Sequence, residues 1–152
     1  MLITNEPTTK SVGFIFTCTI NNSYRTGKLI IMKHQQVRDF FKEDYPRLYL
    51  LSGSKVTTQI DLNDKSQIGY YKNVLAITWL TINELENTRQ KPYKTIITGY
   101  YIDHIAMKDI RQKIGYCKNA TNKKHNEALK SFAETFKQEQ IKNKVYPLLE
   151  FE

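Results

Sequence analysis

The only adjacent acid–imidazole pair in the chain is Asp103 and His104. A carboxylate that orients an imidazole is the arrangement that general acid–base catalysis needs. Neighbours in a sequence need not face each other, however, and Asp103 is equally suited to cap a helix that starts after it. We therefore expect Asp103 to be a helix cap and His104 to be a surface residue, with a catalytic pair as the alternative.

Two pairs of acids have spacings that offer two oxygens to a metal ion: Asp61 with Asp64, and Glu84 with Glu86. Both pairs fall in polar connectors, and neither has a third ligand at a recognisable spacing. The chain also lacks the motifs of P-loop and dinucleotide-binding proteins, serine hydrolases and zinc peptidases. We expect no catalytic residue, no metal and no cofactor, and keep a small nuclease-like enzyme as an alternative.

The basic residues of the C-terminal third are the best functional feature of the sequence. Between Lys108 and Lys144 there are ten basic and four acidic residues, which is +6 of the total net charge of +8. Four of these lysines recur every seven residues, at Lys123, Lys130, Lys137 and Lys144. Seven residues are nearly two helical turns, so the spacing predicts a stripe about 31 Å long on one helix. Such a row can follow a phosphate backbone.

Phosphate contacts are expected from nine residues of this region, namely Lys108, Arg111, Lys113, Lys118, Lys123, Lys124, Lys130, Lys137 and Lys144. The chain has 18 lysines and 5 arginines, which favours phosphate contacts with weak sequence preference over base readout. Two other interpretations stay open. Lysine has AT-rich codons, so codon bias is another source of the excess. Glu127 and Glu134 also follow lysines by four residues, as on an ordinary solvated helix face.

The basic residues must be held in place by a folded core, and its clearest element is a long apolar run, residues 74–82. This run carries the only tryptophan, Trp79. Its β-branched and aromatic residues favour a strand, and apolar residues on both faces are typical of a central strand covered on both sides. A helix is the alternative. We expect Trp79 to be mostly buried.

Further strands are predicted at residues 12–20, 28–32, 47–51, 56–62 and 93–102 from alternating or apolar patterns. A short helix is predicted after His34 and should end at Tyr45, because Pro46 disfavours a helical conformation before it. Two helices are predicted near the C-terminus, at residues 103–114, stopped by Gly115, and at residues 122–143. This order predicts one α+β domain over residues 1–152, with a mainly antiparallel sheet of about six strands packed by these helices.

The length of 152 residues and the charged share of 25% are ordinary for a globular protein. No run is long and apolar enough for a membrane span, no signal peptide is recognised, and Cys18 and Cys117 lack metal-type spacing, so a cytoplasmic protein with free thiols is expected. The expected function is non-enzymatic binding of DNA or RNA through the basic C-terminal helices. The main alternative is an interaction module, an inhibitor or adaptor, that docks on an acidic protein surface.

Overall fold

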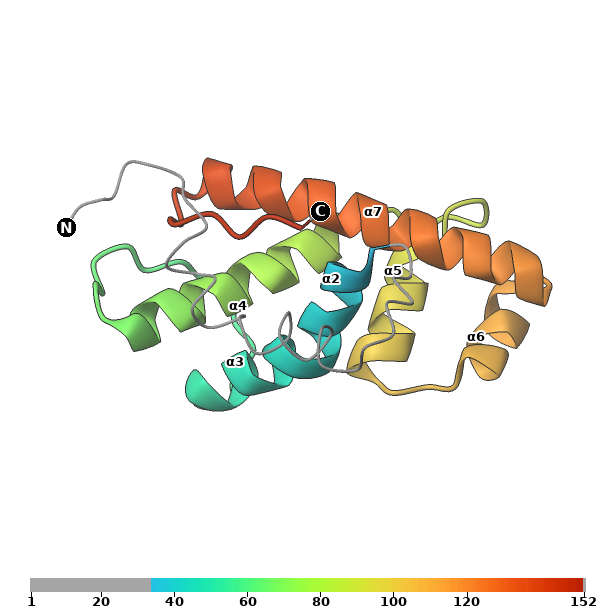
Figure 1. Cartoon of the computed structure of the whole chain (residues 1–152), viewed down its shortest axis with the longest axis horizontal. Coiled ribbons are helices and arrows are strands. Elements are labelled where there is room, and N and C mark those ends of the chain that lie inside the picture. Colours follow the sequence, from blue (N-terminus) through green and yellow to red (C-terminus); the bar gives the residue numbers. More distant parts are fainter. Residues whose placement is uncertain (1–33, 152) are drawn as a thin grey trace, which may run out of the picture.

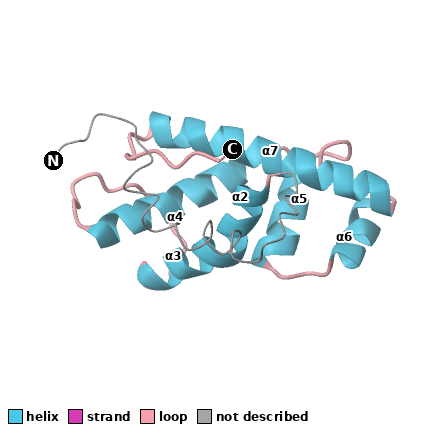
Figure 2. Cartoon of the chain, viewed as in Figure 1, coloured by secondary structure: helices cyan, strands magenta, loops and turns pink. Residues whose placement is uncertain are grey.

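The computed structural model describes residues 34–151, and this part of the chain folds into helices (Figures 1 and 2). In chain order they are α2 (Gln35–Asp39), η1 (Phe40–Asp44), α3 (Tyr45–Leu51), α4 (Gln67–Glu84), α5 (Tyr93–Ile97), η2 (Thr98–Ile102), α6 (Met107–Ile114) and α7 (Lys118–Lys142). No strand occurs within residues 34–151. The predicted α+β fold with a six-strand antiparallel sheet is therefore wrong. The strands predicted at residues 12–20 and 28–32 lie outside the described residues.

Two stretches of π-helix belong to longer continuous helices: η1 lies between α2 and α3, and η2 forms the end of the helix that begins with α5. The N–H of Tyr45 bonds to the carbonyl of Phe40, five residues earlier, and the N–H of Asp103 bonds to Thr98 in the same way at 2.9 Å. This wider turn explains why Pro46 does not end the first helix as predicted. Pro46 lies in the first turn of α3, directly after the π-turn has shifted the hydrogen-bond register, so its missing N–H is tolerated there.

The predicted central strand, residues 74–82, is part of α4, the most enclosed helix of the described region. Every residue from 74 to 78 is at most 1% exposed, and α3 and α7 both pack against the helix. A helix that is covered all round is apolar all round, so it lacks the amphipathic period that identifies surface helices. The buried hydroxyls of Thr78 and Thr81 donate to carbonyls four residues earlier, at 2.9 and 2.8 Å, and so need no partner outside α4.

The other described strand predictions are also wrong. Residues 47–51 form α3 and residues 93–102 form α5 and η2. Residues 56–62 form a largely exposed connector. Asn73 of α4 binds this connector through two 3.0 Å hydrogen bonds to the backbone N–H and carbonyl of Asp61. Trp79 is half-buried rather than mostly buried, and its indole N–H donates to the hydroxyl of Tyr45 at 3.2 Å.

Aromatic side chains from the first helix and from α7 form the centre of the core. The ring of Phe132 lies 4.7 Å from Phe41 and 5.4 Å from Phe136, measured between centroids, and Phe151 closes the cluster from the C-terminal segment. The last helix, predicted at residues 122–143, is confirmed, and it starts four residues earlier, at Lys118. The buried amide of Gln140 then holds the backbone N–H and carbonyl of Leu149 at 2.9 and 2.8 Å.

None of the helices within residues 34–151 combines enough length with enough apolar character to cross a membrane.

Candidate nucleic-acid interface

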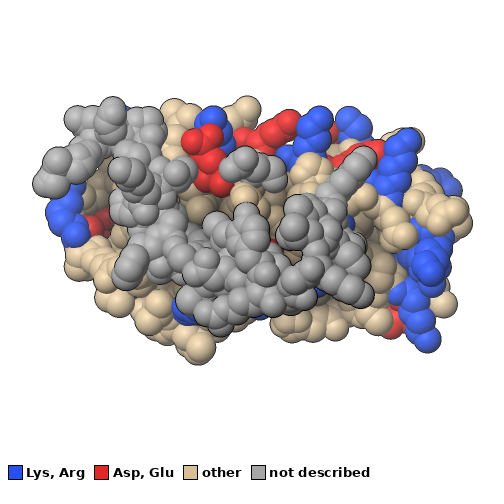
Figure 3. Space-filling view, in the orientation of Figure 1, with Lys and Arg blue, Asp and Glu red and all other residues tan. Residues whose placement is uncertain are grey.

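Positive charge is concentrated in one part of the described chain. Residues 85–124 contain nine basic and three acidic residues, whereas residues 34–84 have six of each and residues 125–151 have four of each. The whole net charge of the described region, +6, therefore comes from residues 85–124. In Figure 3, Lys and Arg atoms gather at the end of the molecule where α6 and the first turns of α7 lie. We call this part, formed by residues 85–92, α6 and the first two turns of α7, the basic end.

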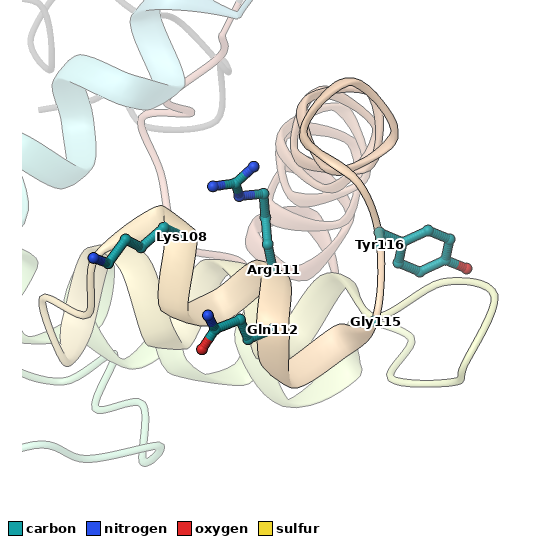
Figure 4. A pocket seen from close by; sticks show the side chains of 5 residues that line it. All are labelled: Lys108, Arg111, Gln112, Gly115 and Tyr116. Carbon is teal, nitrogen blue, oxygen red and sulfur yellow. The ribbon is translucent and has the colours of Figure 1, made fainter.

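A helix–turn–helix arrangement forms the middle of the basic end. α6 has eight residues, and only three residues separate it from α7. Gly115 makes the turn possible, because its φ of 78° and ψ of 24° lie in the left-handed region that glycine adopts without strain. Its N–H and that of Tyr116 both bond to the carbonyl of Arg111, at 2.8 and 3.3 Å. Figure 4 shows the outcome, with α6 running across the view while α7 is seen almost end-on.

A close approach between η2 and α6 fixes the first helix of this unit. A Cβ atom on Gly99 would come within 3.3 Å of the side chain of Ile110, so the absence of a side chain at position 99 lets the two helices touch. Ile110 is 1% exposed and is the one residue of α6 that is fully enclosed. The remaining residues of α6, including Lys108 and Lys113, keep contact with solvent.

The first turns of α7 present two different faces. Thr121 and His125 are buried and anchor the helix, whereas four polar residues are exposed at its outer end: Lys118, Asn119, Asn122 and Lys123. His125 accepts or donates a 2.9 Å hydrogen bond with the hydroxyl of Tyr101, depending on its tautomer. Burial, together with the positive charges of Arg38 and Lys42, lowers the pKa of His125 to about 4, so it is neutral at pH 7.

Lys124 differs from its neighbours because its charge is used inside the fold. Its ammonium lies 5.8 Å above the ring of Tyr116 and 3.6 Å from a carboxylate oxygen of Glu127. Glu127 also accepts a 2.9 Å hydrogen bond from Tyr93, and burial, followed by this contact, raises the pKa of the Tyr93 hydroxyl to about 12. The hydroxyl of Tyr116 in turn donates to the backbone oxygen of Arg89 at 2.8 Å, which ties residues 85–92 to the turn.

Two shallow depressions flank the turn. The first has a volume of about 390 Å³ and is lined by Lys108, Arg111, Gln112, Gly115 and Tyr116 (Figure 4). The second has a volume of about 480 Å³, and Arg89 and Lys113 are its charged residues. Both are open, and most of their lining residues are polar or charged, which suits a contact with an extended anionic surface better than the enclosure of a small molecule.

The structure brings together six of the nine predicted site residues, and these form part of the basic end: Lys108, Arg111, Lys113, Lys118, Lys123 and Lys124. Lys130 and Lys137 are exposed farther along α7, and Lys137 lies 2.8 Å from Glu150. Lys144 lies beyond the end of α7 with a left-handed φ of 58°. The predicted seven-residue stripe is therefore a helical row over three lysines, from Lys123 to Lys137.

The other candidates from the sequence do not form a cluster. Asp103 is the C-cap of η2, and the N-cap of α6 is Ala106, so the prediction that Asp103 caps the following helix is wrong. His104 follows with a φ of 56°; both residues are exposed, and neither donates to nor accepts from the other. Asp64 accepts hydrogen bonds from Ser66, and Glu86 pairs with Lys91 at 3.5 Å. Across residues 34–151 no three His, Cys, Asp or Glu side chains come close enough together to hold a metal ion. Cys117 is an exposed free thiol, and Cys18 lies outside the described residues.

Sequence reasoning missed Arg89, Asn119 and Asn122 as members of this surface. Arg89 comes before the stretch in which basic residues were counted, and only the hydrogen bond from Tyr116 shows that its loop adjoins the turn. Gly115 was recognised as a helix stop, but not as the centre of a helix–turn–helix. Comparisons of the chain with protein-family models, curated proteins and solved structures give no significant match.

Proposed function

We propose that this protein binds double-stranded DNA, with the basic end against the duplex and the first turns of α7 in the major groove. The observation that carries the proposal is the coincidence of two independent features. The helix–turn–helix of α6 and α7 lies where the whole net charge of the described region is concentrated. In DNA-binding proteins with this motif, the second helix enters the major groove while the first crosses the backbone.

The shape of the surface favours a duplex over a single strand. An α-helix with its side chains is 10–12 Å across, about the width of the major groove. Proteins that bind single strands usually add exposed aromatic rings on which bases stack. Tyr71 and Tyr101 are buried here, and Tyr70 is half-buried with its hydroxyl bonded to Pro147. These three tyrosines therefore contribute to packing instead of forming an exposed surface on which bases stack.

Arg89, Lys108, Arg111 and Lys113 lie on both sides of the turn and are suited to contact phosphates beside the groove. Residues 34–151 provide none of these four with a carboxylate at ion-pair distance, so their charge is directed to solvent or to a ligand. We also propose that the protein is located in the cytoplasm, as predicted from the sequence.

The salt dependence of binding tests this proposal. The full chain is titrated with a fluorescent 20-base-pair duplex at several salt concentrations between about 50 and 250 mM. Each phosphate contact contributes about −0.9 to the slope of log affinity against log salt. The double variant Arg111→Gln/Lys113→Gln should therefore flatten the slope by about 1.8.

The matched control is Lys55→Gln/Lys65→Gln, which removes the same charge from exposed positions outside the basic end. It should leave the slope nearly unchanged. Equal losses in both double variants would mean that net charge alone drives binding. If the unmodified chain binds no nucleic acid at about 50 mM salt, the proposal is wrong and docking on an acidic protein becomes the better interpretation.

A further inference from the structure

The start of α7 contains three asparagines whose presence helix stability does not explain. Asn119, Asn122 and Asn126 are spaced by three and four residues, so they share one side of the helix. Asparagine is among the weaker helix formers, because its amide competes with the backbone for hydrogen bonds. Asparagine is favoured at the N-cap itself, but that position is held by Cys117, which provides no side-chain cap.

The three amides have different surroundings. The carbonyl oxygen of Asn126 accepts a 2.7 Å hydrogen bond from the guanidinium of Arg38, so this amide is used within the fold. Asn119 and Asn122 are exposed, and neither side chain has a hydrogen-bond partner among residues 34–151. Two amides, each with an acceptor and two donor hydrogens, are therefore exposed at the outer end of the helix.

We propose that Asn119 and Asn122 read adenine bases in the major groove, which gives the protein a sequence preference. This inference rests on the proposed binding of duplex DNA. The amide oxygen of asparagine accepts from N6–H of adenine while its N–H donates to N7, a pair that matches no other base in the same geometry. Three residues rise about 4.5 Å along a helix, against about 3.4 Å per base pair, so the two adenines belong to neighbouring or next-neighbouring base pairs.

The charges around the two asparagines fit this assignment. Lys118 and Lys123 are exposed on the same turns, and Lys108 and Arg111 come from α6. Lysine and arginine side chains that contact phosphates set the register of a protein on DNA without reading its sequence. Asn119 and Asn122 are the uncharged polar groups at the outer end of α7, and they are held between these cations.

Selection from a random duplex library tests the inference. The full chain is used to enrich 20-base-pair duplexes at about 100 mM salt, and the bound pool is sequenced. We expect adenine to be enriched at two positions one or two base pairs apart. Asn119→Ala should remove the preference at one of them and Asn122→Ala at the other, each by about 5- to 150-fold.

Gln138→Ala is the matched control, because it removes an exposed amide from the same helix five turns away. It should leave both preferences intact. Alanine is the better helix former, so all three variants are expected to fold, which circular dichroism verifies. Enrichment without a motif, or a motif that neither asparagine variant alters, overturns the inference while DNA binding stands. If the library is not retained at all, the proposed function fails as well.

Discussion

Acidification should lower the stability of this protein, because the buried imidazole of His125 is neutral in the folded chain. The imidazole is 5% exposed, bonded to the Tyr101 hydroxyl and placed near the cations Arg38 and Lys42. Burial, followed by these positive charges, lowers its pKa in the folded chain to about 4 from its ordinary value of 6.5. Between those two values the unfolded chain binds a proton at this position and the folded chain does not.

The direction and size of the effect follow from proton linkage. Stability falls wherever the unfolded state binds more protons, so the contribution of His125 is fully present above about pH 6.5 and is lost as the pH falls to about 4. The separation of the two pKa values corresponds to about 3 kcal/mol of unfolding free energy over this range. Carboxylates also titrate near the lower end of the range, so the effect of His125 must be measured as a difference between variants.

Urea denaturation at intervals from pH 7.5 to pH 4 provides that difference. His125→Gln removes the titrating group and is expected to lower stability at pH 7 through the lost ring contacts with Tyr100 and Tyr101. Its unfolding free energy should then decline by about 3 kcal/mol less than that of the unmodified chain on acidification. His104→Gln is the control and should keep the full decline, because His104 is exposed. Parallel curves for the unmodified chain and His125→Gln would refute the reasoning.

Two further predictions concern the core and are measured by urea denaturation at pH 7. Phe132→Ala should lower the unfolding free energy by about 3–5 kcal/mol, because the ring is fully buried among four other phenylalanines; a loss below about 1 kcal/mol would contradict this packing. Gln140→Ala should cost about 3 kcal/mol, because it leaves the buried N–H and carbonyl of Leu149 without partners. An unchanged midpoint for Gln140→Ala would show that the C-terminal segment does not depend on this amide.

The sequence predicted the helices correctly where one side of the helix is exposed to solvent. α7 has its apolar residues Leu129, Phe132 and Phe136 at helical spacing with charged residues between them, and it was identified almost to its ends. The end of α6 was placed correctly because Gly115 marks it, whereas its start, expected after Asp103, lies at Met107. In both cases the exposed side of the helix supplied the period that the prediction needed.

The same reasoning failed where a helix is enclosed. In α4 the residues from 74 to 78 are buried regardless of the side on which they lie, so no period distinguishes a helix from a central strand. Valine, isoleucine and threonine then favoured the strand, but tertiary packing against α3 and α7 outweighs that local preference. The π-turn before Pro46 has no comparable sequence signal either.

The basic composition of the candidate site could be predicted from the sequence, but its three-dimensional arrangement could not. The charges were counted from Lys108 to Lys144, whereas within residues 34–151 the excess of basic residues lies in residues 85–124. The stripe from Lys123 to Lys144 was inferred from spacing alone, and the end of α7 at Lys142 interrupts it. The position of α6 against η2 depends on the close approach of Gly99 and Ile110, which no local pattern reveals.

The most direct test of DNA binding through the basic end is a map of backbone amide chemical shifts. The labelled full chain is titrated with a 20-base-pair duplex of mixed sequence at about 50 mM salt, and the shift changes are assigned to residues. The account predicts that the changes concentrate in the basic end, that is, in residues 85–92, in α6 and in the first two turns of α7. Changes centred on residues 130–150 or on α3, or no changes with duplex, would contradict it.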